Sequence, residues 1–164
     1  MMRAMVLAAG FGKRLQPITL AKPKPLVEIA GRTLLDRALD QLAAAGIDAA
    51  IVKVHYLGDQ IIAVAQAGLH RVAMTISDER DGVLETGGGV VKALPLLGPD
   101  PFITINADTF WVEMSSGDPT IARMVDQFDA ARMDILLLVC APERVVGHSG
   151  GVDFIMDDHG RLRR

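Results

Sequence analysis

Short apolar runs alternate with amphipathic segments along this chain. Largely apolar runs predict strands buried on both faces, because a half-exposed strand alternates apolar and polar residues instead. Such runs span residues 4–9, 49–54, 72–76, 101–106 and 134–140. Between them, apolar residues recur at helical spacing and predict helices over residues 34–43, 61–66, 86–94 and 120–131. The alternation predicts an α/β fold of the Rossmann-like, three-layer α/β/α type with a mostly parallel sheet.

Local signals mark the ends of two of these helices. Thr33 precedes the first helix and can accept a hydrogen bond from an N–H group of its first turn. Gly46 follows the same helix and can adopt the left-handed backbone that closes a helix. The helix that begins near Thr86 is expected to end before Pro95.

The C-terminal residues have the pattern of a β-hairpin. Residues 152–156 predict a strand, residues 157–160 a turn, and residues 161–164 the start of the returning strand. A lone hairpin is a poor place for a domain to finish, because its edge groups stay unpaired. We therefore expect a single domain over residues 1–164 that is incomplete at its C-terminus.

The composition restricts the classes of partner. The chain has 164 residues and a mass of 17.6 kDa, which suits one domain. A formal net charge of −3 and a pI of about 5.8 give no basic footprint for nucleic acid or anionic membranes. Mean hydropathy is high at +0.29, but no run reaches the roughly 18 apolar residues that a membrane span needs. We expect neither nucleic acid nor a membrane as a partner.

The single cysteine, Cys140, excludes an intramolecular disulfide and any site with several cysteine ligands. It fits a reducing compartment, so we expect a cytoplasmic protein. Cys140 ends the apolar run 134–140 and is expected in the core rather than at a reactive site.

The richest chemistry follows the first predicted strand. Gly10 and Gly12 permit close approach of the backbone to a ligand, so that successive N–H groups can point at phosphate oxygens. Arg14 supplies a planar fork for such oxygens, and Lys24 a point charge. The prolines on both sides of Lys24 stiffen its backbone and lower the entropic cost of holding the ammonium in place.

Three other interpretations of the glycine loop compete with this one. A P-loop requires Ser or Thr after Gly12-Lys13, where this chain has Arg14, so that interpretation fails. A dinucleotide-binding loop requires a third glycine where Leu15 stands and a helix where Pro17 stands, so a dehydrogenase is disfavoured. A tight turn that carries basic surface residues without a ligand stays open.

Two further segments carry candidate chemistry. The run Leu-Glu-Thr-Gly-Gly-Gly over residues 84–89 opens a predicted helix, where bare N–H groups can receive a base edge or a phosphate. A flexible glycine turn is the alternative. Asp108 lies just beyond the carboxyl end of the predicted strand 101–106, where open α/β sheets place their ligands. A carboxylate there suits Mg²⁺, although a loop or capping aspartate is the alternative.

The joined motifs resemble those of the sugar-1-phosphate nucleotidylyltransferases. The signature Gly-x-Gly-x-Arg-Leu-x-Pro-x-Thr begins at Gly10, Pro-Lys-Pro-Leu surrounds Lys24, and the later glycine is Gly31. The resemblance covers essentially the whole chain. It implies a nucleotide-diphospho-sugar transferase fold and Mg²⁺-dependent transfer of a nucleoside monophosphate to a sugar phosphate.

The resemblance also implies roles for individual residues. The catalytic residues would be Arg14, Lys24 and Asp108, with Asp108 as the metal ligand. The nucleotide would be bound by Leu7, Ala8, Ala9, Gly10, Gly12, Lys13, Arg14, Thr86, Gly87, Gly88 and Asn106.

The run at residues 84–89 is most similar to the uridylyltransferases that act on N-acetylmuramic acid 1-phosphate. This implies UTP and that sugar phosphate as substrates, UDP-sugar and pyrophosphate as products, and a place in cell-wall sugar recycling. A guanylyl- or thymidylyltransferase for another hexose or heptose phosphate stays open, as does a non-catalytic nucleotide-binding fragment or paralogue. The oligomeric state, a homo-oligomer included, is not fixed by the sequence.

The chain departs from the family pattern at three points. Val83 stands where some relatives have a glutamine that reads the base, and Ala107 replaces the usual glycine before Asp108. The second metal-binding aspartate and several sugar contacts of the family would follow residue 164. These departures put the base and the activity of this chain alone in doubt.

Overall fold

The computed structural model describes residues 2–82, 84–113, 117–147 and 150–164. The chain divides into two compact units, Met1–Ala130 and Ala131–Arg164. The larger unit contains the parallel sheet and its helices, and the smaller unit contains a two-stranded hairpin.

The sheet of the larger unit has four parallel strands in the order β5-β4-β1-β6. They are β1 (Arg3–Leu7), β4 (Ala49–Val54), β5 (Ala73–Asp78) and β6 (Phe102–Asn106). From β1 the chain proceeds outward to β4 and β5, and then crosses back to place β6 on the other side of β1. Ligands of open α/β sheets bind where the strand order reverses, which here is beside the carboxyl end of β1.

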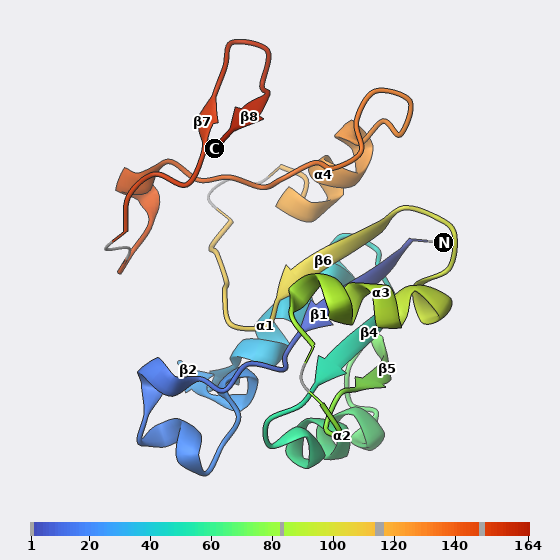
Figure 1. Ribbon diagram of the computed structural model, residues 1–164, viewed down its shortest axis with the longest axis vertical. Helices are drawn as coiled ribbons and strands as arrows, with labels where there is room; N and C mark the ends of the chain where they lie inside the picture. Colours follow the sequence, from blue (N-terminus) through green and yellow to red (C-terminus); the bar gives the residue numbers. More distant parts are fainter. Residues whose placement is uncertain (1, 83, 114–116, 148–149) are drawn as a thin grey trace. The chain divides into compact units, whose positions relative to one another are not determined.

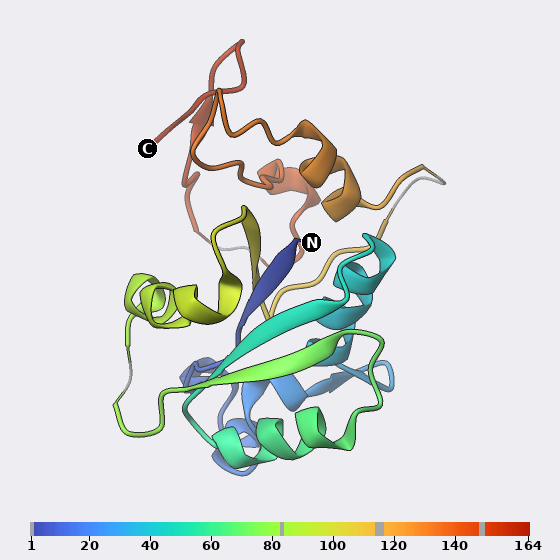
Figure 2. The same ribbon diagram turned by 90° about the vertical axis from the view of Figure 1, so that its right-hand side faces the viewer.

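Helices cover both faces of this sheet. Figures 1 and 2 show α3 (Thr86–Leu97) on one face and α1 (Leu34–Ala44) on the other. The helices α2 (Gly58–Ala67) and α4 (Thr120–Gln127) contribute Ile61 and Ile121 to the core on the α1 side. The three-layer α/β/α fold expected from the sequence is therefore confirmed.

Alternating residues of the strands fill two separate cores. Val6 and Val52 belong to the larger cluster with α1, whereas Met5 and Ile51 pack with Ala93 and Leu97 of α3. The strands β1 and β4 are therefore buried on both faces, which explains their largely apolar sequences.

The predicted ends of α1 are confirmed. Thr33 Oγ1 accepts from the Asp36 N–H at 3.0 Å, and the Asp36 carboxylate accepts from the Thr33 N–H at 3.0 Å, which is a capping box. Gly46 has a φ of 75° just after the helix. Such a backbone favours glycine, which has no Cβ to clash.

Short elements connect β1 to α1. Three 3₁₀ turns, η1 (Lys13–Leu15), η2 (Ile18–Leu20) and η3 (Lys24–Leu26), precede a small hairpin. That hairpin pairs β2 (Glu28–Ile29) antiparallel with β3 (Arg32–Thr33). The connection is thus ordered by local backbone bonds although it contains no long helix.

The structure corrects four details. Pro95 lies inside α3 instead of after its end. The helix tolerates a proline there because only one backbone hydrogen bond of the last turn is lost, and the added residues bury Leu97. Residues 134–140 form no strand, since an apolar run alone supplies no neighbour for its backbone groups. Cys140 is consequently exposed rather than in the core. The helix α4 ends at Gln127 instead of residue 131, because Phe128 takes an extended backbone.

The smaller unit contains the predicted hairpin. Strand β7 (Ile155–Met156) pairs antiparallel with β8 (Leu162–Arg163), after the 3₁₀ turn η4 (Pro142–Arg144). Asp157 Oδ1 accepts from the N–H groups of His159 and Arg161, each at 2.9 Å, and so orders the turn. Among the described residues, no helix is both long and apolar enough to cross a membrane.

Candidate active site

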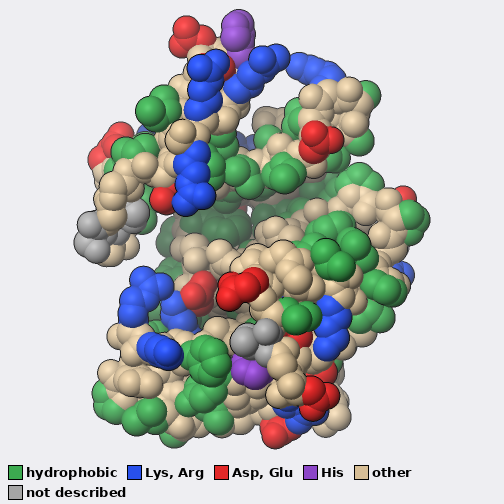
Figure 3. Space-filling model, in the orientation of Figure 1, with side chains coloured by type: hydrophobic (Ala, Val, Ile, Leu, Met, Phe, Trp, Pro, Cys, Tyr) green, Lys and Arg blue, Asp and Glu red, His purple; other side chains and the backbone are tan. Residues whose placement is uncertain are grey.

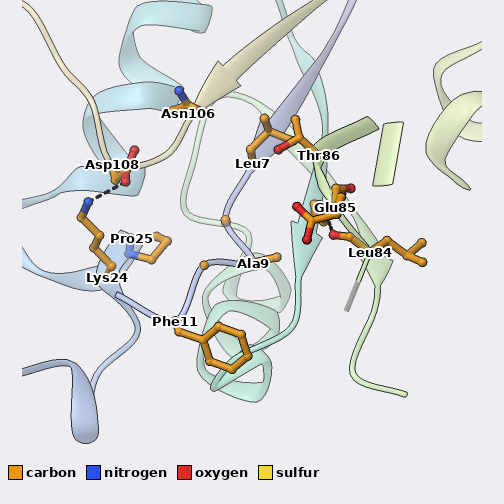
Figure 4. Close-up of a pocket in the computed structure, with 13 residues that line it drawn as sticks. Leu7, Ala9, Phe11, Lys24, Pro25, Leu84, Glu85, Thr86, Asn106 and Asp108 are labelled. Atoms are coloured by element: carbon orange, nitrogen blue, oxygen red, sulfur yellow. Dashed lines mark hydrogen bonds and ion pairs between the residues drawn. The ribbon is translucent and has the colours of Figure 1, made fainter. Parts of the chain in front are cut away.

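A cavity of about 360 Å³ opens at the carboxyl ends of β1, β4 and β6. Figure 4 shows Lys24 and Asp108 on one side, Leu84, Glu85 and Thr86 on the other, and Leu7 and Ala9 between them. The residues that line the cavity are Leu7, Ala8, Ala9, Gly10, Phe11, Lys24, Pro25, Lys53, Leu84, Glu85, Thr86, Asn106 and Asp108.

The floor of the cavity is the end of β1 and the residues that follow it. Backbone bonds hold this segment on both sides: the Ala8 N–H donates to the Lys53 carbonyl at 3.1 Å, and the Ala107 N–H donates to the Leu7 carbonyl at 3.2 Å. Ala8 and Ala9 have small side chains and Gly10 has none. Backbone groups are therefore accessible to a flat ligand along this floor.

The charged side of the cavity consists of Lys24 and Asp108. Lys24 Nζ lies 2.6 Å from Asp108 Oδ2 in an ion pair whose side chains are 23% and 37% exposed (Figure 4). Pro23 and Pro25 are both buried, so the backbone on each side of Lys24 is fixed by packing as well as by the proline rings. The pair places a cation and an oxygen ligand at the same edge of the cavity.

The glycine loop packs tightly behind Lys24. Gly12 has a φ of 62°, and a Cβ there would lie 2.8 Å from Thr19 Cγ2 and 3.2 Å from Lys24 Cβ. Thr19 is fully buried, and its hydroxyl donates to the Gly12 carbonyl at 2.9 Å. Close packing against Thr19 and Lys24 therefore requires a glycine at position 12, whether or not a ligand binds there.

The predicted nucleotide-binding and catalytic residues divide into two groups. Eight of them line the cavity: Leu7, Ala8, Ala9, Gly10, Lys24, Thr86, Asn106 and Asp108. The others, Gly12, Lys13, Arg14, Gly87 and Gly88, do not line it. Arg14 is exposed on η1 and forms no hydrogen bond or ion pair within the described residues, so its guanidinium has freedom to turn toward a bound anion.

Basic side chains gather beside the charged side of the cavity. Figure 3 shows Lys and Arg side chains over the part of the larger unit that carries β2. The exposed basic residues of the segment between β1 and α1 are Lys13, Arg14, Lys22 and Arg32. On the opposite wall, Glu85 contributes a carboxylate. The exposed basic side chains therefore favour an anionic group on their side of the cavity.

Comparison with known proteins decides the family. The sequence profile of the nucleotidyl transferase family, described as "Nucleotidyl transferase", matches residues 3–151. The chain belongs to the nucleotidyl transferase family. The match includes both sides of the cavity, so the glycine loop, Lys24 and Asp108 all lie within the family's region.

Two curated relatives from this family resemble the chain in sequence. An N-acetylmuramate alpha-1-phosphate uridylyltransferase of Caulobacter vibrioides is 40% identical over 98% of this chain and 66% of its own length. One of Neisseria meningitidis is 43% identical over 65% of this chain and 47% of its own length. The chain therefore spans no more than about two thirds of the length of these relatives.

A solved structure shows the same fold. A UDP-glucose pyrophosphorylase complexed with UDP-glucose superposes with a TM-score of 0.66 at 18% identity, over 77% of this chain and 52% of that one. This likeness supports the fold assignment of the nucleotidyl transferase domain and nothing finer.

The cavity offers a carboxylate that could hold Mg²⁺. Asp108 offers a carboxylate, whereas the described residues contain no group of three or more His, Cys, Asp or Glu that could hold a metal ion. Mg²⁺ at such sites uses one or two carboxylates together with substrate phosphates and water. Asp108 suits a metal ion that arrives with a nucleotide.

Sequence reasoning missed several residues that line this cavity. Phe11, Pro25 and Lys53 line it, together with Leu84 and Glu85, which the sequence marked only as part of a motif. Lys53 is the one detectable case, because a lysine inside the apolar run 49–54 must be paired if it is buried. Val83, which stands where some relatives are expected to have a base-reading glutamine, lies outside the described residues.

Trp111 takes a packing position rather than a place in the cavity wall. It packs against the larger core, and its Nε1–H donates to Glu113 Oε1 at 2.9 Å. Glu113 also accepts from the N–H of Thr120 at 3.0 Å and from the hydroxyl of Thr120 at 2.8 Å. The Thr120 N–H is the first cause that holds the pKa of Glu113 below its usual value, and the Trp111 bond is the next.

Proposed function

We propose that this chain transfers UMP from UTP to a sugar 1-phosphate, with N-acetylmuramic acid 1-phosphate as the favoured acceptor. One observation carries the proposal. This chain is 40% identical to a uridylyltransferase for that sugar phosphate, and its Lys24 and Asp108 form an ion pair at the edge of the cavity. The products are a UDP-sugar and pyrophosphate.

The proposed reaction is an in-line displacement at phosphorus. A phosphate oxygen of the sugar 1-phosphate forms a bond to the α-phosphorus of UTP, and the bond from that phosphorus to the bridging oxygen of pyrophosphate breaks. The attacking oxygen is already anionic, so no residue has to remove a proton. Positioning and charge neutralisation are then the main tasks of the protein.

Lys24 and Arg14 perform the neutralisation in this proposal. The Lys24 ammonium is at the cavity edge and offsets negative charge on the phosphates as the α-phosphorus is attacked. Arg14 lies on η1, within the segment that joins β1 to Lys24, and its guanidinium suits the leaving pyrophosphate because it binds two oxygens at once. Glu85 on the far wall repels phosphates and leaves that side to the base.

Mg²⁺ is the implied cofactor, and Asp108 is the residue that would hold it. When bound with the nucleotide, the ion would neutralise charge on phosphate oxygens and orient them. Asp108 keeps one oxygen on Lys24 Nζ, so the carboxylate also fixes the position of the ammonium at the cavity edge.

The base belongs on the side of Leu84, Glu85 and Thr86 in this proposal. These residues form the wall away from the basic segment, and the first N–H groups of α3, which have no partner within the helix, are the backbone groups left for a base. Val83 carries no amide to read a base, so selection of uracil would rest on backbone groups. We retain the cytoplasm as the expected compartment, on the ground of the single cysteine.

The test combines binding and turnover of the 164-residue chain. Titration calorimetry with UTP, GTP, dTTP, CTP and ATP in magnesium chloride should show the tightest binding for UTP. Pyrophosphate release should then require a sugar 1-phosphate and be fastest with N-acetylmuramic acid 1-phosphate.

Other results point elsewhere. A preference for GTP or dTTP would favour the guanylyl- or thymidylyltransferase alternative. Nucleotide binding without pyrophosphate release would favour a nucleotide-binding chain that does not catalyse transfer. Absence of heat with every triphosphate would reject the proposal altogether.

A further inference from the structure

A buried ion pair lies at one wall of the cavity, which its lysine helps to line. Lys53 Nζ is 3.1 Å from Glu79 Oε2, with side chains 5% and 0% exposed. Lys53 is on β4 between the buried Val52 and Val54, and alternation along the strand directs it to the α3 face. Neither residue belongs to the motifs from which the family was recognised.

The remaining polar contacts of this pair converge on two residues of the cavity wall. Lys53 Nζ donates to the carbonyl oxygens of Leu84 at 2.7 Å and Glu85 at 3.2 Å. Glu79 Oε2 accepts from the Leu84 N–H at 3.0 Å. The pair therefore binds both the N–H and the carbonyl of Leu84 and fixes the orientation of its two peptide groups.

Glu79 is itself anchored to β4. Its N–H donates to the Val54 carbonyl at 2.9 Å, and its carbonyl accepts from His55 Nδ1 at 2.8 Å. Because a carbonyl only accepts, this contact places the proton of the His55 ring on Nδ1. Contacts with β4 and His55 thus fix Glu79, and Glu79 together with Lys53 fixes the cavity wall at Leu84 and Glu85.

The start of α3 is fitted to the same pair. A Cβ at Gly89 would lie 2.5 Å from Lys53 Nζ and 2.7 Å from Glu79 Oε1. The absence of a side chain at Gly89 lets the helix approach the two charged groups. Gly89 also donates its N–H to the Glu85 carbonyl at 2.9 Å, which closes the first turn of the helix.

We propose that Lys53 and Glu79 are positioning residues, which hold Leu84 and Glu85 in the conformation that the nucleotide meets. The inference rests on the proposed function, because it takes this wall as the base side of a nucleotide site. A buried ion pair is weak evidence of a role in stability, since two apolar residues of similar volume often support a fold equally well. The hydrogen bonds of Lys53 to Leu84 and Glu85, and of Glu79 to Leu84, indicate instead that the pair orders this part of the wall.

The decisive variant replaces both residues, K53M together with E79M, so that no unpaired charge stays buried. We expect a folded protein whose affinity for UTP in magnesium chloride, measured by calorimetry, falls by about tenfold or more, because ordering the freed wall then opposes binding. Hydrogen exchange of the Leu84 amide in the ligand-free protein should become about tenfold faster, while amides of β1 keep their rates. An affinity of the folded double variant within about twofold of the wild type would overturn the inference, and so would an unchanged Leu84 exchange rate.

Two further variants secure the interpretation. R80A removes the exposed ion pairs of Arg80 with Asp59 and Asp78 beside the same connection, and it should leave UTP affinity and Leu84 exchange unchanged. G89A keeps both charged residues but displaces them, so it should speed Leu84 exchange even if the double variant does not fold. An unchanged Leu84 rate in G89A would count against the inference.

The two proposals fail in distinguishable ways. If the wild-type chain binds no nucleoside triphosphate, the proposed function is rejected, while Leu84 exchange still decides whether the pair orders the wall. If the wild type binds UTP and the folded double variant binds it equally well, only the positioning role is rejected.

Discussion

Lys24 and Asp108 are 84 residues apart in the sequence and meet at 2.6 Å. Each is held by its neighbours: Lys24 stands between two buried prolines, and Asp108 follows the end of β6. An ammonium and a carboxylate that are already in place lose little conformational freedom when a ligand binds. At the scale of single residues, this arrangement is the strongest feature of the candidate site.

Substitution of either partner should abolish most of the turnover. We expect K24A and D108N each to lower kcat/KM for pyrophosphate release by about a hundredfold, the usual cost of losing one transition-state donor or ligand. Far-UV circular dichroism should stay that of the wild type, because both side chains are half-buried at the surface of the cavity.

A matched lysine provides the control for this experiment. Lys22 precedes Lys24 by two residues, pairs with Glu28 at 3.4 Å and does not line the cavity. K22A should therefore retain turnover close to that of the wild type. Near-normal turnover in K24A or D108N would reject the catalytic assignment, and an equal loss in K22A would point to a general charge effect.

At the scale of elements, α3 begins with residues that weaken a helix, and packing holds it in place. Its first turn contains three consecutive glycines, yet they have different surroundings. A Cβ added at Gly87 would meet no atom within 4 Å, whereas one added at Gly89 would meet Lys53 and Glu79. The helix therefore offers a direct comparison between glycine as a helix-weakening residue and glycine as a packing requirement.

Alanine at these two positions should have opposite effects on stability. G87A should raise the free energy of unfolding by about 0.4–1 kcal/mol, because alanine restricts the unfolded chain and favours the helix. G89A should lower it by about 1–3 kcal/mol, since the added methyl group overpacks the buried ion pair. Urea denaturation at neutral pH measures both values, and a stabilising G89A would contradict the packing described for α3.

The elements differ in how far the sequence alone predicts them. The helix α1 was fully predictable, because its capping residue, its apolar spacing and its glycine stop are all local signals. The strand expected over residues 134–140 was wrong, because strand formation depends on a partner that a local pattern does not reveal. Pro95 was likewise misjudged, since the burial of Leu97 favours one more turn of helix.

For the whole molecule, the dependence of stability on pH should include a contribution from Glu113. This carboxylate joins Trp111 to the first residue of α4 through three hydrogen bonds, which keep its pKa in the folded protein below the usual 4.5. Because the pKa of Glu113 is lower in the folded than in the unfolded protein, its carboxylate stabilises the fold when the pH is above the usual pKa. This stabilisation is lost as the pH falls through the pKa of the folded protein.

The variant E113Q tests this contribution. At neutral pH its thermal midpoint should lie a few degrees below that of the wild type, because charge-assisted hydrogen bonds are lost. The gap should narrow as the pH falls below about 4.5, since the wild-type carboxyl then becomes neutral as well. Differential scanning calorimetry from neutral pH down to about pH 3 provides the comparison, and a constant gap over this range would exclude the proposed titration.

The candidate site was predictable where its chemistry resides in a motif, and hidden where it depends on packing. Lys24, Asn106 and Asp108 belong to recognisable motifs, and the structure brings all three to one cavity, while their roles stay predictions. Lys53 lies on β4 and Glu79 directly follows β5, and only the register of these two strands brings them together. No local pattern connects them to Leu84.

The strand order of the sheet also sets when the site comes into existence. Strand β1 and the segment that carries Lys24 leave the ribosome early, whereas β6 and Asp108 follow after β4 and β5 have been synthesised. During that interval the ammonium of Lys24 has no counter-ion from the end of β6, and β1 has a neighbour on one side only. On the function proposed above, the nascent chain therefore cannot form the complete nucleotide site before β6 and Asp108 have been synthesised.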